Sequence, residues 1–129
     1  MMVATGTGNG RYPDALVDCG RFVPSALHAQ EPAAVFELLS RSTAWVDQGL
    51  KLRDYDATPS IKHYVLVSQD EPRAMVYTRD AGGRLDIRDA VLLERADREI
   101  ALPGLGVVVR LASLYDGLEA WPDGIGRTL

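Results

Sequence analysis

The sequence has few of the residues that mark specialised classes of small protein. One cysteine, Cys19, and two histidines in 129 residues exclude an intramolecular disulfide and give no zinc-ligand spacing. No apolar run approaches the roughly 18 residues that a membrane helix needs, and the N-terminus lacks the basic and apolar segments of a signal peptide. We therefore expect a cytoplasmic protein with no membrane partner, in which Cys19 is a small core residue.

Positive charge is also scarce. Lys and Arg total 14 against 18 Asp and Glu, which gives a net charge of −4, and Lys51 and Lys62 are the only lysines. Proteins that bind nucleic acid usually carry a basic patch, because neutralising phosphates supplies most of the binding free energy. Any contact with nucleic acid is therefore expected to be local or transient, or to be supplemented by a partner subunit.

What is present is the composition of one globular domain. The apolar fraction is 47% and the charged fraction 25%, so the chain can bury a core. Residues 1–10 are rich in glycine and are expected to form a flexible leader or a hairpin turn. Residues 11–118 are expected to form the folded domain, and residues 119–129 a loose tail.

Apolar runs of strand length follow one another between turn signals. Strands are expected at 15–17, 33–39, 63–67, 74–78, 85–88 and 106–110, with 90–93 pairing nearby and a last helical turn at 111–118. One helix is expected from 44 to 57, capped by the hydroxyls of 40–43, with an apolar stripe made by Trp45, Val46, Leu50 and Leu52. This order predicts an α/β fold: a mixed sheet with several antiparallel strands and one major helix.

Three charged side chains are unusual within this pattern. Glu37 interrupts the apolar strand 33–39, where an unpaired carboxylate is costly to bury. Asp14 follows Pro13 just before the first strand. Lys51 lies beside the apolar stripe of the helix, with Asp47 and Tyr55 four residues to either side. Two acids and an amine that meet at the edge of a sheet can hold a divalent metal beside a water molecule.

Plainer interpretations of the same residues stay open. Asp14 can be a turn residue, and Asp47 with Lys51 an ordinary i,i+4 ion pair. Glu37 and Lys51 can form a buried salt bridge with no metal and no catalysis. Tyr55 can be an amphipathic packing residue.

The ordered set of these residues resembles the Uma-two family. Its members are described as restriction endonucleases of bacteria, within the PD-(D/E)xK nuclease superfamily. The resemblance rests on segments 12–14, 36–43 and 61–67, together with the helix positions of Asp47, Lys51 and Tyr55, and it continues more weakly to about residue 118. It implies a restriction-endonuclease-like core that hydrolyses DNA with Mg²⁺ or Mn²⁺. Because two active sites are needed to cut both strands at once, it also favours a homodimer.

The resemblance assigns roles position by position. Asp14 and Glu37 match the two metal-binding acids, Lys51 is expected to be the catalytic lysine, and Asp47 and Tyr55 match supporting positions. The superfamily usually has its lysine two residues after the second acid, where this chain has Leu39. Lys51 on the following helix is expected to replace it.

The resemblance also leaves other functions open. Family members usually carry several dozen residues before the Pro-Asp pair, whereas twelve precede it here. The alternative expectation is therefore a catalytically inactive, truncated homologue that acts as a binding or regulatory module. A third possibility is a hydrolase of nucleotides or small phosphate esters.

Overall fold

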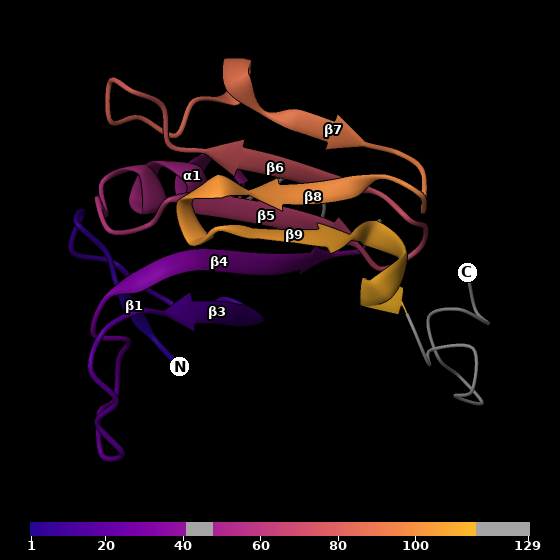
Figure 1. Ribbon diagram of the computed structural model, residues 1–129. Helices are drawn as coiled ribbons and strands as arrows, with labels where there is room; N and C mark the ends of the chain where they lie inside the picture. The colour runs from indigo at the N-terminus through magenta and orange to yellow at the C-terminus, as the bar shows by residue number, and fades with distance from the viewer. Residues whose placement is uncertain (41–47, 116–129) are drawn as a thin grey trace.

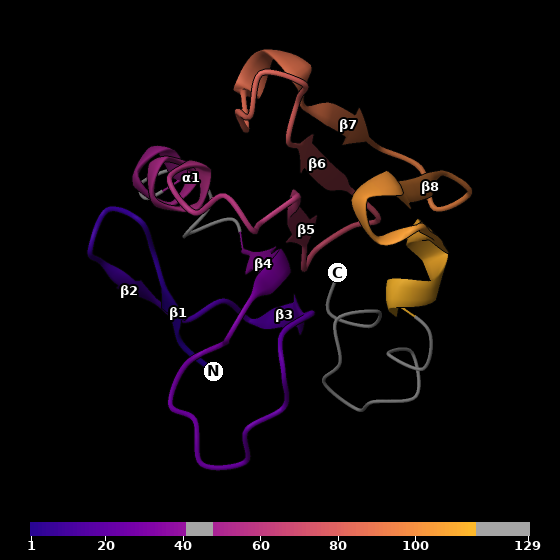
Figure 2. The ribbon, with the colours of Figure 1, turned by 60° about the vertical axis from the view of Figure 1, so that its left-hand side comes forward.

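The computed structural model describes residues 1–40 and 48–115, which form three layers around a mixed five-stranded sheet (Figures 1 and 2). The sheet order is β3-β4-β5-β6-β7. The strands are β3 (Ala15–Asp18), β4 (Pro32–Leu39), β5 (His63–Ser68), β6 (Ala74–Thr78) and β7 (Val91–Leu93). Strands β4 and β5 are parallel and are connected through helix α1 (Gln48–Asp56), whereas all other neighbours are antiparallel. The predicted α/β fold with a mixed sheet and one major helix is confirmed.

Two small β-ribbons flank the sheet. One pairs β1 (Val3–Ala4) with β2 (Gly10–Arg11), and the other pairs β8 (Glu99–Leu102) with β9 (Val107–Arg110). Three short 3₁₀ helices lie between or after these strands: η1 (Ile87–Asp89) before β7, η2 (Pro103–Leu105) between β8 and β9, and η3 (Leu111–Tyr115) after β9. Figure 2, which looks along the sheet, shows α1 against one face and the β8–β9 ribbon against the other. No helix in the described segments is long and apolar enough to cross a membrane.

Successive side chains of the central strands point to opposite faces of the sheet, so each face packs into a hydrophobic core of its own. Tyr64 and Leu66 of β5 point toward α1, where they join Val3, Val35, Tyr55, Ile61, Tyr77 and Leu85. Val65 and Val67 point the opposite way and pack with Ala74, Val76, Ile100, Leu102 and Leu111. Burial on both faces explains why β5 is apolar almost throughout.

The structure corrects four expectations. Residues 85–88 are not a strand, because the Asp86 side chain accepts a hydrogen bond from the Arg88 amide and starts η1. Cys19 is exposed, not a core residue. Leu50 is 57% exposed and so is not on the buried side of α1, whereas Leu52 packs against the core as expected. Of the two alternatives for residues 1–10, the hairpin turn is the one that forms, between β1 and β2 and with Val3 fully buried, and the flexible leader is not.

Some expectations fall outside the described residues. These are the helix cap at 41–43, the first part of the expected helix at 44–47 with Trp45 and Val46, the end of the last helical turn at 116–118, and the tail at 119–129.

Arg79 closes the end of α1. Its guanidinium donates to the carbonyl oxygens of Tyr55, Asp56, Thr58, Ile61 and Gly83, at distances between 2.7 and 3.1 Å. Carbonyls at a helix C-terminus have no partner within the helix, so a buried cation that reaches several of them stabilises the helix end. Arg79 therefore joins α1 to the loop after it and to the loop after β6.

We expect Arg79→Ala to lower the free energy of unfolding by about 3 kcal/mol, because several buried carbonyls lose their donor. Urea denaturation measures this change. Arg88→Ala is the matched control, since that side chain is 85% exposed and its ion pair is with nearby Asp86. A loss in Arg79→Ala no larger than in Arg88→Ala would contradict this role.

Candidate functional site

A single cross-strand row carries the candidate site. Glu37 of β4 lies opposite Leu66 of β5, Leu66 opposite Met75 of β6, and Met75 opposite Leu92 of β7. On the other side of β4, Ala15 pairs with Phe36, so the next residues along the ladder are Asp14 and Glu37. Residues directly opposite one another in a sheet project from the same face. Asp14, just outside β3, therefore lies near Glu37, and Glu37 is the one of the two that is in the sheet and projects from the face that α1 covers.

Asp14 directly precedes β3. Its carboxylate oxygen Oδ2 accepts a hydrogen bond of 2.7 Å from the backbone amide of Leu38, while the residue itself is exposed. The Asp14 side chain thereby binds a backbone amide of β4 just outside β3, which begins at Ala15. This contact gives Asp14 a structural task in addition to any role as a ligand, and it fixes the carboxylate beside Glu37.

Glu37 is buried and paired. The residue is only 4% exposed, and its Oε2 lies 2.6 Å from Nζ of Lys51 on the first turns of α1. The ammonium group compensates a carboxylate that would otherwise be costly to keep ionised in a strand. The prediction that Glu37 needs a compensating partner, and that Lys51 points to it, thus agrees with the geometry.

Tyr55, in the last turn of α1, is buried between the helix and the sheet. Its ring packs 5.0 Å from the ring of Tyr64, which in turn stacks on Tyr77 at 5.5 Å. Burial raises the pKa of the Tyr55 hydroxyl above its usual value, and the charge of Glu37 raises it further. Among the described residues, this hydroxyl is the buried side-chain polar atom with no hydrogen-bond partner. A neutral donor is thus held next to the Glu37 carboxylate.

The N-terminal hairpin fixes α1 through Asp54, a residue that the sequence did not mark. The carboxylate accepts hydrogen bonds from Thr7, Asn9 and Arg11, the shortest of them 2.6 Å. Gly6 fits against the end of α1 because a Cβ there would overlap the carbonyl oxygen of Ala57. Asp54 is one helical turn from Lys51, so these contacts also set where Lys51 lies.

Comparison with known proteins agrees with this arrangement. The profile of the Uma2 family, described as "Putative restriction endonuclease", matches residues 1–112. The chain belongs to the Uma2 family. The resemblance inferred from the sequence is therefore confirmed, and it places this Uma2 chain in a family of restriction-endonuclease type.

A curated relative is similar over most of the chain. The uncharacterized protein slr1290 of Synechocystis sp. (strain ATCC 27184 / PCC 6803 / Kazusa) is 31% identical over 114 residues. The alignment covers 87% of this Uma2 chain and 57% of the relative, so the chain spans a little over half of that protein's length. The relative's name states no activity.

The carboxylates of this Uma2 chain suit a cation that keeps much of its water. Within residues 1–40 and 48–115, no group of three or more His, Cys, Asp or Glu side chains is placed to enclose a metal. Asp14 and Glu37 form a pair instead, one exposed and one buried. Mg²⁺ is commonly bound by one or two carboxylates together with water and substrate phosphates, so the donor set fits that ion. Asp47 lies outside the described residues.

Asp54 predicts a pH dependence of stability for this Uma2 chain. Burial alone would raise the pKa of Asp54, but the hydrogen bonds from Thr7, Arg11 and Asn9 hold it below its usual value. A lowered pKa in the folded state stabilises the protein above the unfolded pKa of roughly 3.9. That contribution is lost as the pH falls through the folded value. We expect Asp54→Asn to cost about 2 kcal/mol at neutral pH and much less in acid.

Urea denaturation of the wild-type and Asp54→Asn chains at neutral and acid pH checks this expectation. Asp97→Asn is a suitable control, because that carboxylate is 57% exposed and its ion pair is with nearby Arg95. An equal loss for Asp54→Asn at both pH values would show that the hairpin contact is not held by the ionised form.

Proposed function

We propose that this protein is a Mg²⁺-dependent endonuclease that hydrolyses phosphodiester bonds in DNA, with Asp14 and Glu37 as metal ligands and Lys51 as the catalytic lysine. Membership of a restriction-endonuclease family supports the class of reaction. The observation that supports the site most directly is the buried Glu37 carboxylate, 2.6 Å from Lys51, with Asp14 bonded to the amide of the following residue, Leu38. Mn²⁺ is expected to substitute for Mg²⁺.

The two carboxylates differ in a way that suits this task. Glu37 is buried and held by Lys51, so its position is fixed before a ligand arrives. Asp14 is exposed, and one of its oxygens is held by the Leu38 amide, which directs the carboxylate toward the end of β4. When bound there, Mg²⁺ supplies positive charge beside the phosphate and makes an attacking water more acidic.

Lys51 brings a point charge to the same place. An ammonium group has three N–H donors, and the bond to Glu37 uses one of them. A second donor can orient the attacking water or bind a phosphate oxygen as negative charge develops on it. The Lys51 side chain is 24% exposed, so solvent and a substrate can reach part of it.

Tyr55 and Asp47 are proposed as supporting residues. The Tyr55 hydroxyl is neutral at physiological pH because burial and Glu37 raise its pKa. It can donate a hydrogen bond to Glu37 when the carboxylate shifts toward a ligand.

Since the net charge is −4, the affinity for DNA has to come from the site itself and from a second copy of the chain, in line with the proposed homodimer.

We expect Glu37→Gln and Lys51→Gln to lower Mg²⁺-dependent cleavage of plasmid DNA by about 100-fold or more, because each removes a charge from the reacting centre. Glutamine at position 51 can still donate to Glu37, which limits the destabilisation that an unpaired buried carboxylate would cause. Lys62→Ala is the matched control, since Lys62 is the other lysine and is exposed. Wild-type cleavage rates in both site variants would remove these residues from the mechanism.

The second candidate function is a binding or regulatory module without catalysis. The observation that favours it is the Glu37–Lys51 pair itself, which is complete without a metal at 2.6 Å. In that case the site would be a structural salt bridge, and the chain would act through its fold or by dimerisation.

Metal titration separates the two functions. For the nuclease, we expect the wild-type chain to bind Mn²⁺ in calorimetry and Glu37→Gln and Asp14→Asn to lose that binding, because each removes one of two carboxylate ligands. Glu31→Gln, which alters an exposed acid outside the row, should bind as the wild type does. Identical titrations for the wild type and both site variants would favour the module.

A further inference from the structure

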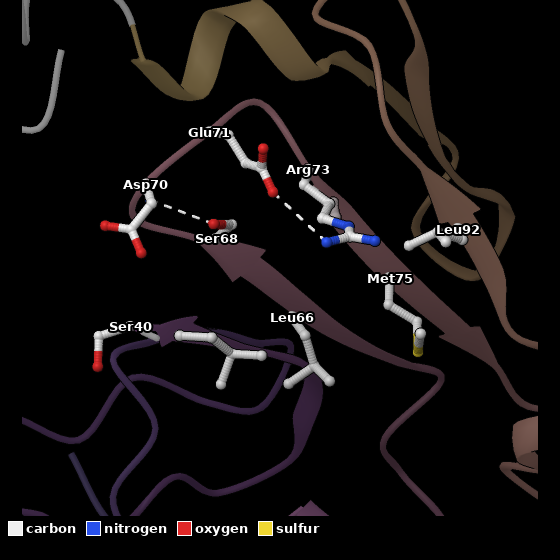
Figure 3. A pocket seen from close by; sticks show the side chains of 10 residues that line it. Ser40, Leu66, Ser68, Asp70, Glu71, Arg73, Met75 and Leu92 are labelled. Carbon is white, nitrogen blue, oxygen red and sulfur yellow. Dashed lines mark hydrogen bonds and ion pairs between the residues drawn. The ribbon is translucent and has the colours of Figure 1, made fainter. Parts of the chain in front are cut away.

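A pocket opens on the α1 face of the sheet immediately beside Glu37. It has a volume of about 350 Å³ and lies at the carboxyl ends of β4 and β5 (Figure 3). Its apolar surface comes from four neighbouring strands: Leu39, Leu66, Met75 and Leu92. Leu66 is the direct cross-strand partner of Glu37, and Leu39 follows Glu37 by two residues on the same face. With strands about 4.8 Å apart, the pocket begins one strand away from the proposed metal ligands.

The polar rim of the pocket favours a neutral ligand with hydrogen-bond donors. It is formed by Ser40, Ser68, Asp70, Glu71 and Arg73. The Arg73 guanidinium pairs with Glu71 at 3.4 Å and with Glu94 at 3.2 Å, so its charge is already compensated. Two carboxylates and one compensated cation repel a phosphate and accept N–H groups instead. Figure 3 shows Asp70 and Ser40 at one end of the pocket and Met75 and Leu92 toward the other.

The rim is built firmly enough to select a ligand. The Tyr115 hydroxyl donates to the carbonyl oxygens of Ser68 and Glu71, at 2.6 and 2.8 Å. The Asp70 amide donates to the Ser68 hydroxyl oxygen at 3.1 Å, which closes the turn between β5 and β6. These contacts hold the backbone of the turn that carries Asp70 and Glu71 above an apolar floor. A flat heterocycle can lie on such a floor while its edge reaches the rim.

We propose that this pocket binds an unstacked nucleobase that carries an exocyclic amino group, next to the phosphate held at Asp14 and Glu37. The proposal rests on the proposed nuclease function for the identity of the neighbouring phosphate. The apolar floor takes the face of the base, and a carboxylate of the rim accepts from its amino group, as Asp and Glu do from the amino group of cytosine. Uracil and thymine carry a carbonyl at that position. A hydrogen-bond acceptor of the base would then face the carboxylate acceptors of the rim.

Cytidine and uridine test this selectivity without any cleavage, because they differ in that one group. In an NMR titration of the full chain without metal, we expect cytidine to shift the amide resonances of Leu39, Leu66, Ser68 and Met75. Uridine should bind roughly tenfold more weakly, since one hydrogen-bonded pair is replaced by two facing acceptors. Equal binding of the two nucleosides, or shifts that avoid these residues, would overturn the assignment.

Two adjacent variants of β7 localise the effect. Leu92→Trp places a bulky ring in the mouth of the pocket and should abolish the cytidine-induced shifts. Val91→Trp is the matched control, because Val91 is on the opposite face of the same strand and is 55% exposed. Loss of cytidine binding in both variants, or in neither, would contradict a site in this pocket.

The variant Glu37→Gln distinguishes failure of this proposal from failure of the proposed function. Glu37 is not part of the pocket lining, so this variant should still bind cytidine while losing cleavage. Cleavage that depends on Glu37 together with no cytidine binding leaves the nuclease and removes the base pocket. Cytidine binding without any cleavage by the wild type leaves the pocket and removes the nuclease.

Discussion

The ion pair between Glu37 and Lys51 is the constraint on which the arrangement of the site depends. A carboxylate that is 4% exposed in the middle of a strand would be strongly unfavourable without a nearby opposite charge. Lys51 provides that charge from α1, the connection between the parallel strands β4 and β5. The helix therefore has to lie over the end of β4, with its ammonium group at the Glu37 carboxylate. This contact links the charge of the proposed site to the position of its covering helix.

Hydrogen bonds and ion pairs hold α1 in that position, because the apolar surface of the helix itself is small. Leu50 is exposed, and the buried side of the helix carries Asp54 and Tyr55. Asp54 is held by the N-terminal hairpin, and Arg79 binds the carbonyls at the helix end. Such hydrogen bonds are more specific in direction than apolar contact, so they fix the rotation of the helix as well as its place. The rotation decides whether Lys51 faces Glu37 or water.

The sequence predicted the strands well because strand signals are local. The expected strands at 15–17, 33–39, 63–67, 74–78 and 106–110 agree with the structure to within one residue at each end. Glu37 was recognisable for the same reason, since an acid within an apolar run is visible without knowing its partner. The strand at Glu99–Leu102 was missed, and Asp54 was passed over. Asp54 looked like a surface acid, and its partners Thr7, Asn9 and Arg11 lie more than 40 residues away.

The cross-strand row places two kinds of chemistry in one line. It runs from Asp14 and Glu37, which are charged, to Leu66, Met75 and Leu92, which are apolar. A nucleotide has the same polarity along its own length, with a charged phosphate at one end and a flat, largely apolar base at the other. A substrate laid along the row would meet complementary surfaces in order, with no rearrangement of the strands. Because β4 and β5 are hydrogen-bonded neighbours, a shift of β4 that displaced Glu37 would also move Leu39 at the pocket wall. Recognition of a base and positioning of a phosphate would then be coupled through the backbone of a single strand.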